Sequence, residues 1–293
     1  MTSGPRSAAE NLRDDDLVLE RTSGSDEFMG FAIQVSGQHV GTVALRREDQ
    51  RTGSIRWNSG LDNLQVTVRA LKLAVAHAFD DLGMSRLEAR VPVDRTGDVR
   101  AASIAGLRRE GVLRGAGNDA DHVLLARLAD DPEPFSRDGF IEILNAGLPT
   151  KRVISQGLLR DKLGRILLCE LTYKNEWDLP GGVIEVGEAP SVGLIREVQE
   201  ELGITVEVRD LITVNWLPAW RGWDDACIFL FDLGVVDSSI TTGMTLQPTE
   251  IKAVQWCDPQ TVRSRAAAAA IELLEAVGAG SMPSYREAPK APE

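Results

Sequence analysis

The chain has 293 residues, of which 43% are hydrophobic and 26% are charged, and its formal net charge is −12. This length accommodates two ordinary domains, and the apolar content is enough for packed cores. The negative charge argues against general affinity for nucleic acid polymers or anionic membranes. The longest apolar runs, such as residues 226–231, are far too short to span a bilayer, so no membrane partner is expected.

The three cysteines indicate a reducing compartment. Cys169, Cys227 and Cys257 are widely spaced and odd in number, without a C-x-x-C pair, and no histidine lies near them in the sequence. We interpret them as reduced thiols of a cytoplasmic protein without a zinc site. The N-terminus is polar and acidic, unlike a secretory signal. The abundance of alanine, and of arginine over lysine, points to a GC-rich bacterial genome.

The first half of the chain is expected to form one α/β domain. Residues 1–16 are predicted to be a disordered tail, and residues 17–130 the domain itself. Hydrophobic alternation and helical periodicity predict, in chain order, two strands within 28–47, a strand over 53–57, a helix over 65–82, a strand over 86–93, a helix near 100–107 and a strand over 122–128.

The second half is expected to form a separate α/β domain. The stretch Ala129-Asp-Asp-Pro-Glu-Pro134 breaks the periodicity, so residues 131–149 are predicted to be a linker. The domain then covers residues 150–280, and residues 281–293 are a predicted tail. Its predicted elements are strands over 153–159, 165–171, 205–216, 226–233 and 251–256, and helices over 190–202 and 258–277.

A set of acidic residues with fixed spacing carries the chemistry. From Gly181 the sequence reads GGVIEVGEAPSVGLIREVQEELGI. On the predicted helix over 190–202, Arg196 precedes three glutamates, Glu197, Glu200 and Glu201, whose carboxylates converge on one face. Carboxylates this close repel one another unless a cation neutralises them, and hard oxygen ligands select Mg²⁺ or Mn²⁺. The alternative is a surface helix that is merely acidic.

This stretch matches the box of Nudix hydrolases, G-x5-E-x7-R-E-U-x-E-E-x-G-U with U aliphatic, at every position over residues 182–204. The resemblance implies an α/β/α sandwich with a mixed sheet. It also implies that Glu197, Glu200, Glu201 and the Gly181 carbonyl bind Mg²⁺ or Mn²⁺, with Arg196 among the catalytic residues. The reaction implied is hydrolysis of the diphosphate (acid anhydride) bond of a nucleoside diphosphate linked to another moiety X.

A further acid beyond the box commonly serves as a ligand or general base in proteins of this kind. Glu250 directly precedes the predicted strand over 251–256, where similar proteins place that acid. Asp224 and Asp225 are the competing candidates, and Glu250 could also be an exposed carboxylate at a strand edge.

Tryptophans near the box suggest a nucleobase in the substrate. Trp177 lies just before the box, and Trp216, Trp220 and Trp223 surround Arg221 in a predicted loop. Aromatic faces stack on bases, and an arginine can pair with a phosphate, so these five residues are the expected substrate contacts. The alternative is a loop that packs onto the protein's own surface.

The first domain resembles the GNAT acetyltransferase fold over residues 28–130. The stretch Ala105-Gly-Leu-Arg-Arg-Glu-Gly-Val-Leu-Arg114 looks like that family's G-F-x-x-E-G-x-x-R. Residues 58–66 lack the Q/R-x-x-G-x-G/A loop that cradles the pyrophosphate of acetyl-CoA. We therefore interpret the domain as degenerate and used for packing, homodimer formation or substrate selection. An active acetyltransferase, which would make the protein bifunctional, is the alternative.

A module that senses a nucleotide without cleaving it is a further alternative for the whole protein. The complete carboxylate set argues against it, because a sensor has no need of every glutamate in the box.

Overall fold

The structure, a computed structural model, describes residues 11–25, 27–59, 63–117, 120–219 and 222–288. The chain divides into two compact units, Met1–Pro149 and Thr150–Glu293. In the described residues, no helix combines the length and the hydropathy that a membrane crossing requires.

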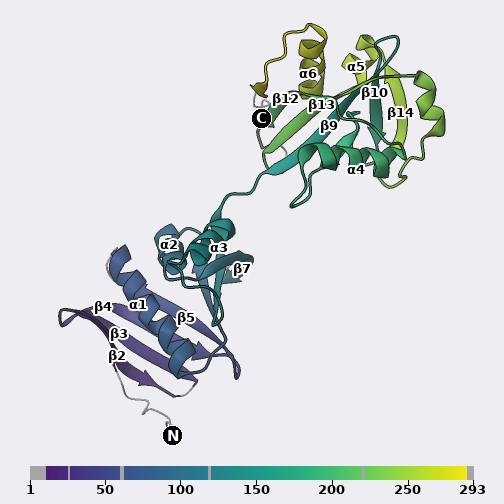
Figure 1. The fold of residues 1–293 in the computed structure, drawn as a ribbon. Coiled ribbons are helices and arrows are strands. Elements are labelled where there is room, and N and C mark those ends of the chain that lie inside the picture. Colours follow the sequence, from purple (N-terminus) through teal and green to yellow (C-terminus); the bar gives the residue numbers. More distant parts are fainter. Residues whose placement is uncertain (1–10, 26, 60–62, 118–119, 220–221, 289–293) are drawn as a thin grey trace. The chain divides into compact units, whose positions relative to one another are not determined.

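The first unit is built on a mixed sheet of eight described strands in the order β1-β2-β3-β4-β5-β6-β8-β7 (Figure 1). The strands are β1 (Leu12–Asp14), β2 (Leu17–Gly24), β3 (Phe28–Val35), β4 (Gln38–Arg47), β5 (Thr52–Ser59), β6 (Arg86–Pro92), β7 (Arg108–Gly117) and β8 (Ala120–Leu128). Among these described strands of the first unit, only β5 and β6 pair in parallel. Part of the expected disordered tail therefore forms β1, whereas residues 1–10 of that tail lie outside the described residues.

Helices α1 (Leu64–Ala76) and α2 (Thr96–Ile104) pack on this sheet. Helix α1 begins where the Asn63 side chain accepts hydrogen bonds from two backbone N–H groups, and it continues into a π-helical turn (His77–Asp81). Fully buried Phe31, Leu71 and Leu125 share one apolar cluster from sheet and helices. The expected α/β class of this unit is confirmed.

The predicted linker, residues 131–149, contains helix α3 (Arg137–Gly147). Its first turn is capped by Ser136, whose hydroxyl oxygen accepts from the Gly139 N–H at 3.1 Å. Arg108 on β7 forms ion pairs with Asp131 and with Glu142 on α3. The prolines on either side of residue 133 thus lie in the connection between β8 and α3, and most of the rest of the predicted linker is helical.

The second unit is built on a mixed sheet in the order β14-β10-β9-β13-β12-β15, with β11 also pairing with β9 (Figure 1). The strands are β9 (Arg152–Asp161), β10 (Ile166–Leu171), β11 (Gly181–Val183), β12 (Asp210–Leu217), β13 (Ala226–Val236), β14 (Ile251–Cys257) and β15 (Tyr285–Glu287). In the sheet, β9 is hydrogen-bonded in register with β10 at one residue pair, Arg160 with Ile166, and it pairs with β11 nearer its start. The strands β9 and β10 therefore separate along most of their length. Strand β11, where the box begins, pairs with β9 in the space between them.

Helices cover both faces of this second sheet. Helix α4 (Pro190–Leu202) packs through Leu194, Val198 and Leu202 on one face, together with Leu159 and Phe231. Helices α5 (Pro259–Arg265) and α6 (Ala268–Gly278) cover the other face, and their core includes Leu158, Leu230, Leu273 and Leu274. A short 3₁₀ helix (Ser238–Gly243) precedes β14. The expected α/β/α sandwich with a mixed sheet is confirmed.

Two elements of the second unit differ from the sequence prediction. The helix expected over 258–277 breaks into α5 and α6, because Ala266 is extended and bridges to Trp177. The expected tail over 281–293 contains β15, which pairs in parallel with β12. In both places a contact with a distant segment decides the local structure, and helix propensity or tail composition does not reveal it.

Candidate active site

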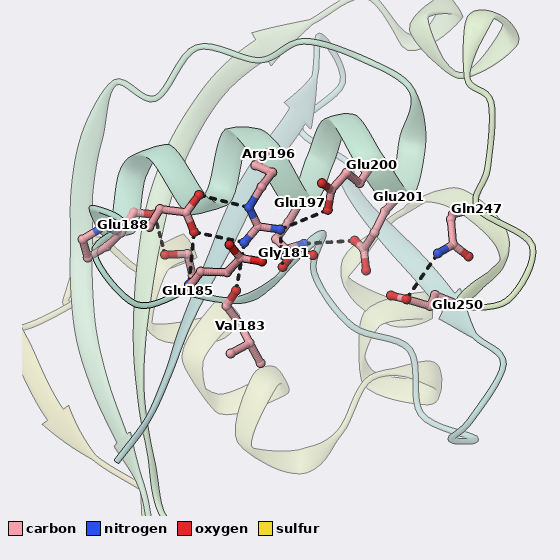
Figure 2. Close-up of polar contacts among 12 residues, drawn as sticks. Gly181, Val183, Glu185, Glu188, Arg196, Glu197, Glu200, Glu201, Gln247 and Glu250 are labelled. Carbon is pink, nitrogen blue, oxygen red and sulfur yellow. Dashed lines mark hydrogen bonds and ion pairs between the residues drawn. The ribbon is translucent and has the colours of Figure 1, made fainter. Parts of the chain in front are cut away.

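Local signals position the box helix. Pro190 occupies the first turn of α4, where its missing N–H costs nothing, and Gly203 ends the helix with a left-handed φ of 70°. Because the apolar stripe of α4 is buried, its other face presents Arg196 and the glutamates to the loop before the helix (Figure 2).

Arg196 is the centre of an ion-pair network (Figure 2). Its Nε and Nη2 lie 3.0 Å from the two carboxylate oxygens of Glu188, and Nη1 lies 3.0 Å from one oxygen each of Glu197 and Glu200. Nη2 also donates to the carbonyl of Val183 at 3.1 Å. This network holds the pKa of Glu188 below its usual value and raises that of Arg196. The sequence pattern includes Glu188 without indicating this role, and its fixed position in the box was the only signal.

Glu201 is the most buried of the box carboxylates. Its side chain is 6% exposed, and Oε2 accepts a long hydrogen bond, 3.4 Å, from the backbone N–H of Gly181. Burial raises the pKa of Glu201 to about 7, and the nearby charges of Glu197, Glu250 and Asp178 act in the same direction. Burial also raises the pKa of Glu197, although the Arg196 guanidinium opposes this shift. The site therefore accumulates negative charge that a cation would relieve.

Gly181 and Gly182 are tightly surrounded. Gly181 has a φ of 130°, and a Cβ there would lie 2.1 Å from the carbonyl oxygen of Ser155. A Cβ on Gly182 would lie 2.5 Å from the carboxylate carbon of Glu197. The first glycine is required by the backbone, whereas the second leaves room for a carboxylate of the site.

Of the candidate acids outside the box, Glu250 is the one that the structure brings to Glu201. It is half-buried directly before β14, and Gln247 Nε2 donates to its Oε1 at 3.3 Å (Figure 2). Its charge acts on both Glu197 and Glu201. Asp225 instead pairs with Lys151 and accepts from Trp216 Nε1 at 3.1 Å. The Asp224 carbonyl accepts from Arg152.

Three of the expected aromatic contacts, Trp177, Trp216 and Trp223, lie in the described residues. Trp177 is 7% exposed and lies in the α5–α6 core, with the Arg265 guanidinium over its ring at 5.4 Å. Trp216 is half-buried, whereas Trp223 is 58% exposed, with Arg152 4.9 Å from its ring centroid. Trp220 and Arg221 lie outside the described residues. Trp177 therefore has a packing role, and Trp223 is the described tryptophan most accessible to a ligand.

The donor chemistry of the site fits a hard divalent cation. The side chains here that could bind a cation, Glu197, Glu200 and Glu201, are all carboxylates, and the backbone carbonyl of Gly181 is part of the adjoining strand. As the described side chains stand, no three His, Cys, Asp or Glu residues are already grouped as ligands. The ion pairs with Arg196 account for this, because they hold Glu197 and Glu200 toward the guanidinium. Cation binding would require these two carboxylates to turn.

Comparison with known proteins agrees with this geometry. The family model described as the NUDIX domain matches residues 150–277. Over 134 residues the chain is 35% identical to a MutT-like protein of Streptomyces ambofaciens, a match that covers 45% of this chain and 81% of that protein. The chain belongs to the Nudix hydrolase family. This membership confirms the enzyme class that the box predicts.

Two further proteins are similar to separate parts of the chain. A CTP pyrophosphohydrolase of Escherichia coli (strain K12) is 32% identical over 118 residues, which cover 39% of this Nudix chain and 82% of that protein. For the first unit, a GNAT-family acetyltransferase from Bacillus anthracis has a similar structure, with a TM-score of 0.33 and 21% identity over 34% of this chain and 66% of that one. The second similarity concerns the fold alone.

Proposed function

We propose that this Nudix protein hydrolyses the diphosphate bond of a nucleoside diphosphate linked to another moiety X, in the presence of Mg²⁺ or Mn²⁺. The products are a nucleoside monophosphate and phosphorylated X. The observation that supports this most directly is the buried carboxylate of Glu201 beside the Gly181 backbone, among the charges of Glu197 and Glu250. Buried negative charges this close together repel one another without a cation, and they can bind a divalent cation when one is present.

The cation would be held by the carboxylates of Glu197, Glu200 and Glu201 and by the carbonyl of Gly181. When bound, it would withdraw electrons from the diphosphate and activate water. Arg196, whose Nε and Nη2 are fixed by Glu188, holds Glu197 and Glu200 through Nη1 until a cation takes these carboxylates. Glu250, oriented by Gln247, accepts the proton of the attacking water, since it lies directly before β14 and faces Glu201 on α4.

A nucleotide substrate is supported by the relatives' names and by the accessible ring of Trp223. One relative is named a CTP pyrophosphohydrolase, and its match covers most of its own length. Trp223 is more than half exposed, with the Arg152 guanidinium over its ring, so an aromatic base could stack on the remaining accessible ring surface. The described geometry gives Trp177 no part in this proposal.

We also propose a role for the first unit and a cellular compartment for the protein. The first unit would serve packing, homodimer formation or substrate selection without acetyl transfer, and the protein would act in a bacterial cytoplasm. The three cysteines are free thiols, a state that a reducing compartment maintains.

The test is a substrate panel with Mg²⁺ that compares the wild type with Glu200→Gln and identifies products by mass spectrometry. The panel contains canonical-base and oxidised nucleoside triphosphates, ADP-ribose, nucleotide sugars, dinucleotides, CoA and prenyl diphosphates. Glu207→Gln is the matched control, because it removes the same charge from an exposed position beyond α4. We expect a nucleoside monophosphate product that Glu207→Gln retains and Glu200→Gln loses by about 100-fold or more.

Full turnover by Glu200→Gln would show that the box assignment is wrong. Tight nucleotide binding by the wild type without any Mg²⁺-dependent product would support the sensing alternative instead.

A further inference from the structure

One amide side chain of the second unit is buried without a hydrogen-bond partner. Asn215 on β12 is 2% exposed, and its Oδ1 has no partner among the residues that the structure describes. A buried carbonyl that loses water without gaining a donor destabilises the fold, and an apolar side chain of similar shape would avoid this cost. Asn215 is therefore costly for packing alone, and a ligand that pairs with the amide would explain it.

The strand register places Asn215 on the same sheet face as a second amide. Asn215 pairs with Ile228 on β13, and Ile228 pairs with Ile154 on β9. Paired residues point to the same face, and so do residues two positions apart on a strand. Gln156 therefore lies on that face with the other three. We call these four residues, Asn215, Ile228, Ile154 and Gln156, the amide row.

The amide row lies on the sheet face that α5 and α6 cover, next to the apolar core under these helices. Leu230, two residues after Ile228, belongs to that core, which shows that the row is on the α5–α6 face. Within the described part of the unit, Ile154 and Ile228 belong to neither of the two apolar clusters. The row thus combines two aliphatic side chains, buried Ile228 and half-buried Ile154, with a buried amide at each end, beside the two apolar clusters and not within them.

One end of the amide row reaches the candidate active site. Gln156 pairs with Gly181 in the sheet, and its Nε2 donates to Asp178 Oδ1 at 2.8 Å. Asp178 is one of the charges that act on Glu201. Asn215 lies two strands further across the sheet and two residues along it, which is about 12 Å at the usual spacings of about 4.8 Å between strands and about 3.3 Å per residue. A nucleotide spans a distance of this order between its diphosphate and its base.

We infer that Asn215 recognises the nucleobase of the substrate and is a specificity-determining residue. The amide offers both a donor and an acceptor to the polar edge of a base, while Ile154 and Ile228 contact the apolar face of the nucleoside. Gln156 lies at the phosphate end. This inference rests on the proposed function and deepens it, because it assigns a substrate that carries a base and names the residue that reads it.

The test compares Asn215→Leu with the matched control Thr213→Val. Thr213 is also fully buried, two residues away on the same strand, and its hydroxyl donates to the Val214 carbonyl at a long 3.4 Å. We expect Asn215→Leu to raise the KM of the nucleotide substrate about tenfold or more, with a melting temperature equal to or above that of the wild type. Thr213→Val should leave KM unchanged.

A second measurement does not depend on the folding of a variant. A nucleoside monophosphate and ribose 5-phosphate are compared as product inhibitors of the wild type, and we expect the nucleoside monophosphate to inhibit at least about tenfold more strongly. Equal inhibition would overturn the inference, as would an unchanged KM in Asn215→Leu, while nucleotide hydrolysis would still stand. If the wild type cleaved no nucleotide, the proposed function would fail, and the inference with it.

Discussion

Arg196 and Glu188 form a bidentate ion pair, in which Nε lies 3.0 Å from Oε1 and Nη2 lies 3.0 Å from Oε2. The pair joins the loop before α4 to the middle of that helix, and it leaves Nη1 for Glu197 and Glu200. The guanidinium thus forms ion pairs with these two carboxylates and balances part of their negative charge when no cation is present. A cation must compete with Arg196 for them, and Glu188 decides how strongly Arg196 competes.

Glu188→Gln should weaken the response to Mg²⁺. Without the Glu188 charge, Arg196 interacts more strongly with Glu197 and Glu200, so more cation is needed to displace it. We expect the half-saturating Mg²⁺ concentration to rise about tenfold, with kcat at saturating Mg²⁺ close to the wild-type value. The measurement is a Mg²⁺ titration of activity. Glu185→Gln, in the same loop and exposed, is the control. An unchanged Mg²⁺ dependence of Glu188→Gln would contradict the competition between Arg196 and the cation.

Two adjacent glycines should respond differently to alanine. In Gly182→Ala the new Cβ meets the carboxylate of Glu197, the end of a flexible side chain that can move aside. We expect a small loss of stability, below about 1 kcal/mol, and a loss of kcat of about tenfold or more, because Glu197 is displaced. Thermal melts and initial rates measure the two effects. Wild-type activity in a folded Gly182→Ala protein would argue against a role for the Glu197 position.

In Gly181→Ala the new Cβ meets the backbone carbonyl of Ser155, and φ is 130°. Neither constraint can relax without moving β9 or β11. We expect this variant to lose on the order of 3 kcal/mol of stability or more. Denaturant unfolding of both alanine variants, side by side, checks the contrast. Equal unfolding midpoints would show that the two glycines are not distinguished as the structure indicates.

Glu201 should make the stability of the metal-free protein depend on pH. Its pKa in the fold is about 7, above the usual 4.5, so the fold favours the protonated form. The stabilising contribution is complete below about pH 4.5 and is lost as the pH rises through about 7. In EDTA, Glu201→Gln should therefore melt at a higher temperature than the wild type at pH 8, and at a similar temperature at pH 5.

Mg²⁺ should reverse this difference at pH 8, because the ionised Glu201 then gains a cation that the amide cannot bind as well. Melts of both proteins at the two pH values, with EDTA and with Mg²⁺, give the comparison. If Glu201→Gln melted below the wild type in EDTA at pH 8, the buried carboxylate would be stabilised by something other than a cation.

The sequence predicts α4 well, because its determinants are local. Pro190, the apolar stripe and Gly203 all lie within the helix or next to it, and the predicted helix over 190–202 coincides with α4 (Pro190–Leu202). The spacing of Arg196 and the glutamates follows from that helix alone. The α/β class also follows from the order of strands and helices along the chain, whereas the α/β/α sandwich is implied by the resemblance to Nudix hydrolases.

The remaining features depend on contacts between distant segments. The break between α5 and α6 comes from the bridge of Ala266 to Trp177, and the alanines on either side give no sign of it. Trp177 precedes the box in the sequence, yet its side chain is buried in the apolar core under α5 and α6. The position of Asn215 becomes meaningful only through the register of β12, β13 and β9, which a single sequence does not specify.

Strand β15 should be required for the stability of the second unit. It pairs in parallel with β12, where the Val214 N–H donates to the Ser284 carbonyl at 3.0 Å and the Ala288 N–H donates to the Trp216 carbonyl at 2.9 Å. Arg286, in register with Asn215, also reaches Glu272 on α6 at 3.3 Å. Truncation after residue 281 should remove on the order of 2–3 kcal/mol of stability and expose the edge of β12 to association with other chains. Truncation after residue 288 is the control and should melt like the full chain. Calorimetry and light scattering of the three proteins measure both effects, and equal melting of all three would mean that β12 needs no neighbour on this side.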